Sequence, residues 1–342
     1  MKKLNENRKK WLIQRNKAIM LQMRKRNNRK NNKKSGNIKS GKRKTSHKVN
    51  INAPEKFSII ENSNETLCFF NNVFEIIKKV KKMGEIFFDL SNIIYVTVDA
   101  IMYLTALIKN TRLIKAFKIS CSGNMPRNRE ARLIIEKSGF YNYVIPKHTV
   151  RNYDSSKICI EQGEEADPEL TGKICEFVHE KMKLSMIETK SLYPLIIELM
   201  TNTKQHAYNK NILMCNKWYI YVEKCDNYIQ FVYLDTGAGI PNTIKTNFRE
   251  KVDDFINNSD AYFIASALKG DFRTETQKSY RGKGLPEIYN RVSENHVSDF
   301  NIVSGKGLCH IDRSNIINEV KLDSNLVGTL FYWKFAKKEE ES

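Results

Sequence analysis

The sequence predicts an α/β chain of two domains behind a basic N-terminal tail. Between about residues 52 and 150, short apolar strand-like runs alternate with helix-like runs, a pattern that is typical of α/β layers. Helix-like and strand-like runs return between about 170 and 338. The acidic segment between the two regions contains Gly163 and Pro168, and residues 151–169 are therefore predicted as a linker. A chain of 342 residues is long enough for two hydrophobic cores.

The tail, residues 1–50, carries most of the net charge of +20. It holds 19 of the 58 Lys and Arg residues and a single acid, Glu6. The apolar clusters Trp11–Ile13 and Ile19–Met23 are too small to form a core, so we expect a largely disordered tail with one helix near 8–26. Three interpretations stay open: a solubilising arm, an arm that binds nucleic acid, and an arm that binds an anionic membrane surface.

Composition excludes several classes of protein. The N-terminal charges are not followed by the apolar stretch of about 7–15 residues that a signal peptide requires. The best apolar run, Ile93–Ile108, is too short for a transmembrane helix and contains Asp99. The seven cysteines are odd in number and form no C-x-x-C pair, which argues against a disulfide framework and against a zinc site. The sequence therefore predicts a cytoplasmic protein.

The first domain is predicted over residues 52–150 from the alternation of apolar runs. The expected elements, in chain order, are a helix at Leu67–Val80, a strand at 85–90, the segment "IIYV", a long helix at Asp99–Ala116, a strand at 117–123, a helix at Arg129–Lys137 and a turn at Ser138-Gly139.

Two segments of this domain, "FFDLSNIIYVTVDAIMYLTALIK" and "RLIIEKSGFYNYV", resemble a STAS domain, the fold of anti-sigma-factor antagonists. STAS proteins of the phosphorylated kind carry Asp-Ser-Ser-Gly at the start of a helix, and the second Ser accepts the phosphate. This chain has Thr97-Val98-Asp99-Ala100 at that place, so Asp99 replaces the acceptor and resembles a permanent negative charge. The resemblance implies a docking or scaffold domain for a protein partner, and an unrelated small α/β domain is the alternative.

The second domain is predicted over residues 170–338, beginning with a helix at about 170–184. The next helix contains "LIIELMTNTKQHAY", which places Glu198, Asn202 and His206 four residues apart on one face. The same spacing also occurs on any solvated helix face, so further motifs have to decide between the two interpretations.

Three glycine-containing segments follow this helix. Strands are expected at 218–225 and 228–241, and the second ends in Asp235-Thr-Gly-Ala-Gly-Ile, a turn whose glycines let the backbone approach a flat ring. "YRGKGLPEIYNRV" is a glycine-rich loop that feeds a helix with Pro286 in its first turn, and N–H groups at a helix start attract phosphate. A last strand at 326–335 begins near Gly328-Thr329.

In order and spacing, these motifs resemble the N, G1, G2 and G3 boxes of the GHKL ATPases. The motifs are Glu-x-x-x-Asn-x-x-x-His-Ala, Asp-x-Gly-x-Gly-Ile, Arg-Gly-x-Gly-Leu and Gly-Thr. That superfamily, which has the Bergerat fold, includes type II topoisomerases, heat-shock-90 chaperones, mismatch-repair ATPases and histidine kinases. The resemblance covers about residues 170–336 and implies a Bergerat-fold α/β sandwich with ATP and Mg²⁺ as cofactors.

The resemblance also implies roles for single residues. Asn202 would hold Mg²⁺, and Glu198 would activate the attacking nucleophile. Asp235 would accept a hydrogen bond from the adenine amino group. The remaining nucleotide-binding residues implied are His206, Gly237, Gly239, Ile240, Arg281, Gly282, Lys283, Gly284, Leu285 and Thr329. The long connection before Arg281 would form a lid, with its best candidates at Arg273 and Thr274.

Three functions stay open. The first is an ATP hydrolase whose nucleotide state switches a lid, a partner or a homodimer interface. The second is an anti-sigma-type serine/threonine kinase that acts in trans, and the third is a catalytically silent ATP-binding regulator associated with nucleic acid. A histidine kinase is rejected, because His179-Glu180 lies only 19 residues before Glu198, which leaves no room for a dimerising hairpin.

Overall fold

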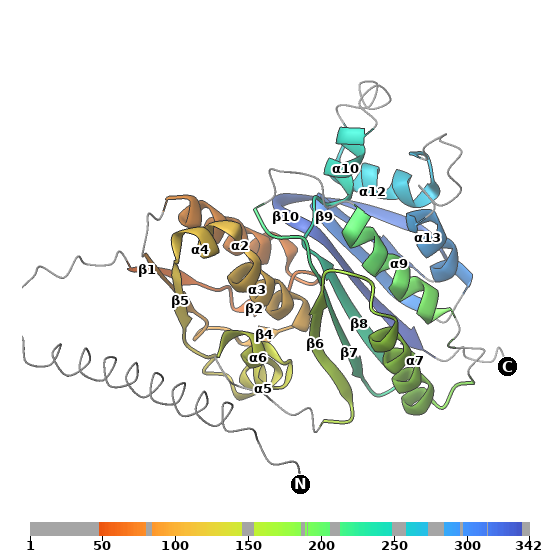
Figure 1. Ribbon diagram of the computed structural model, residues 1–342, viewed down its shortest axis with the longest axis horizontal. Coiled ribbons are helices and arrows are strands. Elements are labelled where there is room, and N and C mark those ends of the chain that lie inside the picture. The colour runs from red at the N-terminus through yellow and green to blue at the C-terminus, as the bar shows by residue number, and fades with distance from the viewer. Residues whose placement is uncertain are drawn as a thin grey trace, which may run out of the picture. The chain divides into compact units, whose positions relative to one another are not determined.

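The secondary structure of the computed structural model is mixed α/β, as the sequence predicts (Figure 1). The residues described are 48–79, 84–145, 154–185, 189, 191–205, 213–247, 258–272, 284–294, 297–312 and 314–336. They belong to one compact unit, 46–342. The tail helix expected near 8–26 lies outside these ranges. Within them, no helix is long and apolar enough to cross a membrane.

The N-terminal half, residues 48–145, is an α/β layer with two small parallel sheets. One sheet has the order β1-β3-β5, and the other pairs β2 with β4. The strands are β1 (Lys48–Asn52), β2 (Lys56–Phe57), β3 (Glu85–Asp89), β4 (Tyr95–Val96) and β5 (Ser120–Gly123). The helices are α2 (Ser63–Lys79), α3 (Val98–Asn110), α4 (Arg112–Phe117), α5 (Arg129–Lys137) and α6 (Phe140–Val144).

Helix α3 is almost completely buried, because its sequence is apolar on nearly every side. It ends where Thr111 adopts an extended conformation (φ −65°, ψ 123°) and forms an isolated antiparallel bridge with Met214 of the C-terminal half. The sequence predicts a single helix over Asp99–Ala116, and this prediction is wrong. The contact with Met214 divides that segment into α3 and α4.

The C-terminal half, residues 154–336, is built on a five-stranded antiparallel sheet of order β6-β7-β8-β10-β9. Its strands are β6 (Lys157–Gly163), β7 (Trp218–Lys224), β8 (Tyr228–Asp235), β9 (Val297–Ile311) and β10 (Ile317–Ala336). Its helices are α7 (Pro168–Met182), α9 (Leu192–Gln205), α10 (Ile240–Asn247), α12 (Asp260–Lys269) and α13 (Gly284–Glu294).

One face of this sheet packs against helices of the same half. Alternate residues of a strand point to the same face, and Phe231 and Tyr233 of β8 share a core with side chains of α7, α9, α12 and α13. The ring of Phe231 stacks on Trp333 of β10 with centroids 4.7 Å apart. In Figure 1, α7, α9 and α13 lie along this face of the sheet.

The other face of the sheet packs against the N-terminal half. Tyr219 of β7 and Leu234 of β8 belong to the same buried cluster as Phe70 of α2 and Tyr103 of α3. Helix α2 packs on β10, and α3 packs on β7 and β8. The five-stranded sheet is therefore buried on both faces, and the two halves share one hydrophobic core.

Three segments differ from the sequence-based expectation. Residues 157–163, which the sequence predicts as part of the linker, form the edge strand β6, in which Glu161 is exposed. Strand β1 begins at Lys48, inside the segment assigned to the tail. Strand β9 was not predicted, although it forms a long hairpin with β10. Each of these strands is fixed by pairing with a distant segment, which local patterns do not reveal.

We expect residues 46–342 to unfold in one cooperative transition, because the buried cluster spans both halves. Urea denaturation followed by hydrogen exchange and mass spectrometry resolves peptides from each half. Peptides of α2 and of β8 should give the same midpoint. As a control, residues 154–342 alone should bind an apolar dye, since the face that carries Tyr219 and Leu234 loses its cover. Two separate midpoints would contradict the prediction.

Candidate functional site

Four residues form a cross-strand row at one end of the C-terminal sheet. Trp218 of β7 lies opposite Asp235 of β8, Asp235 lies opposite Thr329 of β10, and Thr329 lies opposite Ser304 of β9. Tyr233 is two residues before Asp235 and faces the helices, so the Asp235 side chain points to the helix face as well. The row brings together two residues that the sequence predicts for adenine binding.

The turn after Asp235 is held by hydrogen bonds to this row. The Gly237 N–H donates to Oδ1 of Asp235 at 2.8 Å, and the Ile240 N–H donates to Oγ of Ser304 at 3.0 Å. The Ser304 hydroxyl donates to the Gly328 carbonyl at 2.8 Å and lies 3.0 Å from Oγ1 of Thr329. Ser304 therefore ties the turn to β10. Sequence reasoning missed it because a single serine within a strand has no motif around it.

Two glycines allow three backbone segments to meet at this place. Gly239 and Gly328 have φ angles of +83° and +105°, which favour glycine. A Cβ atom on Gly328 would lie 2.0 Å from the carbonyl oxygen of Asp235, and one on Gly239 would lie 2.9 Å from the carbonyl oxygen of Gly328. Gly239 thus approaches β10 closely, whereas the sequence predicts a close approach to a flat ring.

Helix α9 lies beside the row and carries two further predicted residues. The Thr203 hydroxyl of α9 lies 2.9 Å from the Tyr233 hydroxyl of β8, which joins the helix to the strand two residues before Asp235. Asn202 is the neighbour of Thr203, and Glu198 is one turn earlier; both are partly exposed. His206 lies outside the described residues.

Leu285 anchors the start of α13. It is partly buried and packs against both the main core and a small cluster formed by Ile244 and Phe263 of α10 and α12. Gly284 is the first residue of α13. The long connection predicted as a lid contains helices α10 and α12. The predicted residues Arg281, Gly282, Lys283, Arg273 and Thr274 lie outside the described residues.

Asp235 is the titratable group of the row. Burial raises its pKa to about 7, and the hydrogen bond from the Gly237 N–H opposes this rise. Near neutral pH its carboxyl group is therefore close to its titration midpoint. A ligand that donates an N–H to the carboxylate would favour the ionised form. This arrangement suits a specific donor, such as an exocyclic amino group.

The residues present fit a bound magnesium ion only if a ligand supplies most of the coordination. In the described ranges, no three His, Cys, Asp or Glu side chains are grouped as a metal site. The predicted ligand, Asn202 of α9, is partly exposed and offers a single amide oxygen. Mg²⁺ commonly takes one or two protein oxygens together with phosphates and water. The donor set fits an ion that arrives with a phosphate ligand.

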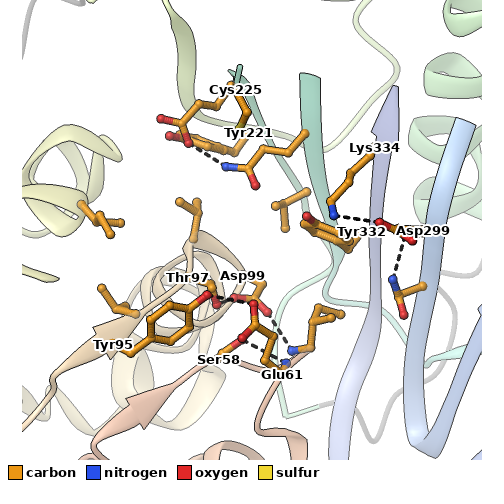
Figure 2. A pocket seen from close by; sticks show the side chains of 18 of the residues that line it. Ser58, Glu61, Tyr95, Thr97, Asp99, Tyr221, Cys225, Asp299, Tyr332 and Lys334 are labelled. Atoms are coloured by element: carbon orange, nitrogen blue, oxygen red, sulfur yellow. Dashed lines mark hydrogen bonds and ion pairs between the residues drawn. The ribbon is translucent and has the colours of Figure 1, made fainter. Parts of the chain in front are cut away.

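A cavity of about 780 Å³ lies between the two halves and contains none of the predicted nucleotide-binding residues (Figure 2). The N-terminal half contributes Tyr95, Asp99 and apolar side chains of α5 to its wall. The C-terminal half contributes the sheet face that carries Tyr221 and Tyr332. This cavity is thus a second concave region, on the opposite face of the sheet from Asp235.

The sheet wall of the cavity is a polar ladder across five strands. Its members are Lys157, Glu223, Gln230, Lys334 and Asp299. Lys157 forms an ion pair with Glu223, Gln230 Nε2 donates to Glu223 at 2.7 Å, and Lys334 Nζ donates to Asp299 at 2.7 Å. The charged groups of the ladder are therefore paired with one another.

Asp99 lies at the start of α3 and faces inward. Its side chain is 2% exposed, and its carboxylate accepts hydrogen bonds from the backbone N–H groups of Ile59, Ile60 and Ala100 at 2.8–3.0 Å and from the Thr97 hydroxyl. Burial raises its pKa, and these hydrogen bonds oppose the rise. The Asp99 carboxyl group is thus enclosed by backbone donors.

We expect Asp99→Ala to lower the free energy of unfolding by about 2–6 kcal/mol, because the N–H groups of Ile59 and Ala100 are buried and each costs about 1–3 kcal/mol when it loses its acceptor. The measurement is urea denaturation at neutral pH. Asp226→Ala serves as the matched control, since Asp226 is exposed and should change stability by less than about 0.5 kcal/mol. Equal stability of the two variants would show that the carboxylate does not hold the Ile59–Ile60 segment.

No protein-family model matches this chain, and no curated protein matches it.

Proposed function

We propose that the C-terminal half is a Bergerat-type domain of the GHKL superfamily that binds ATP with Mg²⁺ and hydrolyses it. One observation carries the proposal: Asp235 and Thr329 lie opposite each other at a strand end where Gly239 and Gly328 bring three backbone segments together. The motif order along the sequence supports the same conclusion independently. The antiparallel sheet with helices on the Asp235 face is the architecture that the resemblance implies.

In this proposal Asp235 selects adenine. Its carboxylate accepts a hydrogen bond from the amino group of the base, and the raised pKa of the unliganded carboxyl makes that bond depend on pH. Thr329, whose hydroxyl lies near Ser304, contacts the base from β10. Gly239 allows the turn to pack closely against Gly328 and Ser304, which holds the turn beside Asp235.

The phosphates lie toward α9 and α13 in this proposal. Asn202 contributes an amide oxygen to Mg²⁺, and the ion would neutralise phosphate charge. Glu198, one turn earlier on α9, orients the attacking nucleophile and takes its proton. The start of α13 presents backbone N–H groups, which favour phosphate oxygens. These roles therefore fall to one segment of α9 and to the start of α13.

The N-terminal half serves as a STAS-like docking module in the same proposal. Asp99 stands at the position of the phosphate acceptor, and its carboxylate is enclosed by backbone donors, so it offers no hydroxyl for phosphorylation. A protein partner would therefore meet the exposed surface of this half. Its exposed apolar side chains include Ile94 and Leu133.

Incubation of the pure protein with γ-labelled ATP and Mg²⁺ tests the proposed reaction. Label released as free phosphate supports hydrolysis. Label on an added STAS protein, or on the chain itself, would show that the protein is a kinase and not a hydrolase. Bound ATP that stays intact would overturn the catalytic part of the proposal and leave a nucleotide-binding regulator.

Asp235→Asn should weaken ATP binding about tenfold or more, because an amide group facing the adenine amino group leaves mismatched polar groups, which cost about 1–3 kcal/mol. The parent protein should bind ATP more weakly as the pH falls below about 7, since protonation removes the charged acceptor. The variant should lack this component of the pH dependence. Calorimetry of both proteins between pH 6 and 8 measures it. Parallel pH profiles would exclude Asp235 from the base site.

Glu198→Ala and Asn202→Ala should separate catalysis from binding. Glu198→Ala should keep ATP affinity and lose turnover by about 10²–10⁴-fold, because a general base acts on the nucleophile. Asn202→Ala should weaken binding in the presence of Mg²⁺, and His206→Ala should do less than either. Thr201→Ala is the matched control on α9, because its hydroxyl bonds only to the Ile197 carbonyl among the described partners. Two variants with parental binding and turnover would make this face an ordinary solvated stripe.

A further inference from the structure

Helix α3 of the N-terminal half reaches both sides of the proposed nucleotide site from the opposite face of the sheet. Tyr103 and Asn110 are seven residues apart, which places them on one side of the helix, two turns from each other. Both are buried, with 0% and 1% of their surface exposed. Their polar atoms bond to segments that lie directly beside Asp235 and Thr329.

Tyr103 holds an irregular point of β10. The register of β10 with β9 shifts between Leu326 and Thr329, so Val327 and Gly328 have no ladder partner in that register. The Tyr103 hydroxyl accepts from the Val327 N–H at 3.0 Å and donates to the Val327 carbonyl at 3.3 Å. One hydroxyl thus satisfies both backbone groups of Val327.

Gly328, the residue after Val327, makes direct backbone contact with the end of β8 that carries Asp235. Gly328 lies so close to β8 that a Cβ atom would be 2.0 Å from the Asp235 carbonyl oxygen and 3.1 Å from Cα of Thr236. The Gly328 carbonyl also accepts from the Ser304 hydroxyl. Gly328 thus joins Val327 to the strand end that carries Asp235 and Thr329.

Asn110 bonds to the segments on the β8 side of this contact. Its Nδ2 donates to the Cys215 carbonyl at 3.1 Å and lies 3.4 Å from Oγ1 of Thr236, the residue after Asp235. The backbone carbonyl of Asn110 also accepts from the Cys215 N–H at 2.9 Å. Thr236 is fully buried, and its hydroxyl bonds to the 215–217 segment as well.

We propose that Tyr103 and Asn110 are positioning residues that set the distance between Asp235 and Thr329 and thereby determine selectivity for adenine. This inference rests on the proposed ATP site. Guanine has a carbonyl group where adenine has its amino group, and that oxygen would face the Asp235 carboxylate. Discrimination against GTP therefore requires Asp235 to be held at a fixed distance from the opposite wall.

Tyr103→Phe removes the hydroxyl and keeps the ring, which packs edge-on against Phe70 at 4.6 Å between centroids. Tyr219→Phe is the matched control. Tyr219 is equally buried in the shared core, and its hydroxyl has no hydrogen-bond partner among the described residues. Asn110→Ala is a second variant that tests the other contact. All three proteins are made as full chains.

The first measurement is amide hydrogen exchange in the absence of nucleotide, which does not depend on the proposed function. Tyr103→Phe should exchange about two- to tenfold faster at residues 327–329, in line with one lost hydrogen bond, and Asn110→Ala should do so at 215–217 and 236. Tyr219→Phe should match the parent at both places. Unchanged exchange in both test variants would overturn the positioning role.

The second measurement is the ratio of ATP to GTP affinity by calorimetry. Tyr103→Phe should lower this ratio by about threefold or more, as expected for one weakened hydrogen bond, while Tyr219→Phe should leave it unchanged. A loss of stability alone would lower both affinities and leave their ratio unchanged. Thermal unfolding of each variant measures the loss of stability separately. A parental ratio in Tyr103→Phe would overturn the selectivity claim.

The two measurements separate this inference from the proposed function. A parent protein that binds neither nucleotide overturns the ATP site and with it the selectivity claim. In that case hydrogen exchange still decides whether α3 holds the 327–329 and 236 segments.

Discussion

The need to bury both faces of the five-stranded sheet governs the whole arrangement. An antiparallel sheet often leaves one face to solvent, and its strands then alternate apolar and polar residues. Strand β8 has the buried sequence Phe231-Val232-Tyr233-Leu234, with neighbours pointing to opposite faces. Helices of the C-terminal half cover one face, and the other face requires α2 and α3. The N-terminal half is therefore part of the core on which the C-terminal sheet depends.

Local signals were enough to predict the parts of the chain that are fixed locally. Helix α5 runs from Arg129 to Lys137 as expected, because the Asn128 side chain caps its start and Gly139, at φ +92°, turns the chain after its end. The turn after Asp235 was recognised from its two glycines. Asp235 on β8 belongs to that motif, and Thr329 on β10 belongs to the separate Gly-Thr motif.

The parts that could not be predicted depend on distant partners. The sequence of β6 predicts an acidic linker, and its pairing with β7 makes it a strand. The break between α3 and α4 at Thr111 exists because Met214 lies beside it. The contribution of Ser304 depends on a register between β9 and β10 that no single segment specifies. The bonds from Tyr103 to Val327 join residues 224 positions apart. No local sequence pattern predicts a contact between residues so far apart in the chain.

The register of β10 against β8 decides the geometry of the candidate base site, and it is specified at both ends. Thr329 lies opposite Asp235, and Lys334 lies opposite Gln230, five residues or about 17 Å further along the strands. At the far end, the paired charges of the polar ladder disfavour a shift by one residue, because a shift would move the charged side chains to the apolar helix face.

Between these ends, the stacked rings of Phe231 and Trp333 fix the same register by packing. At the near end, β10 carries a bulge against its other neighbour, β9, and the backbone groups of a bulged residue need partners outside the ladder. Tyr103 supplies those bonds from outside the sheet. The register of β10 against β8 is thus set by the polar ladder and the stacked rings, and the bonds from Tyr103 add a constraint from the N-terminal half on Val327, which precedes Thr329. That half can therefore influence the candidate base site without contacting a ligand bound there.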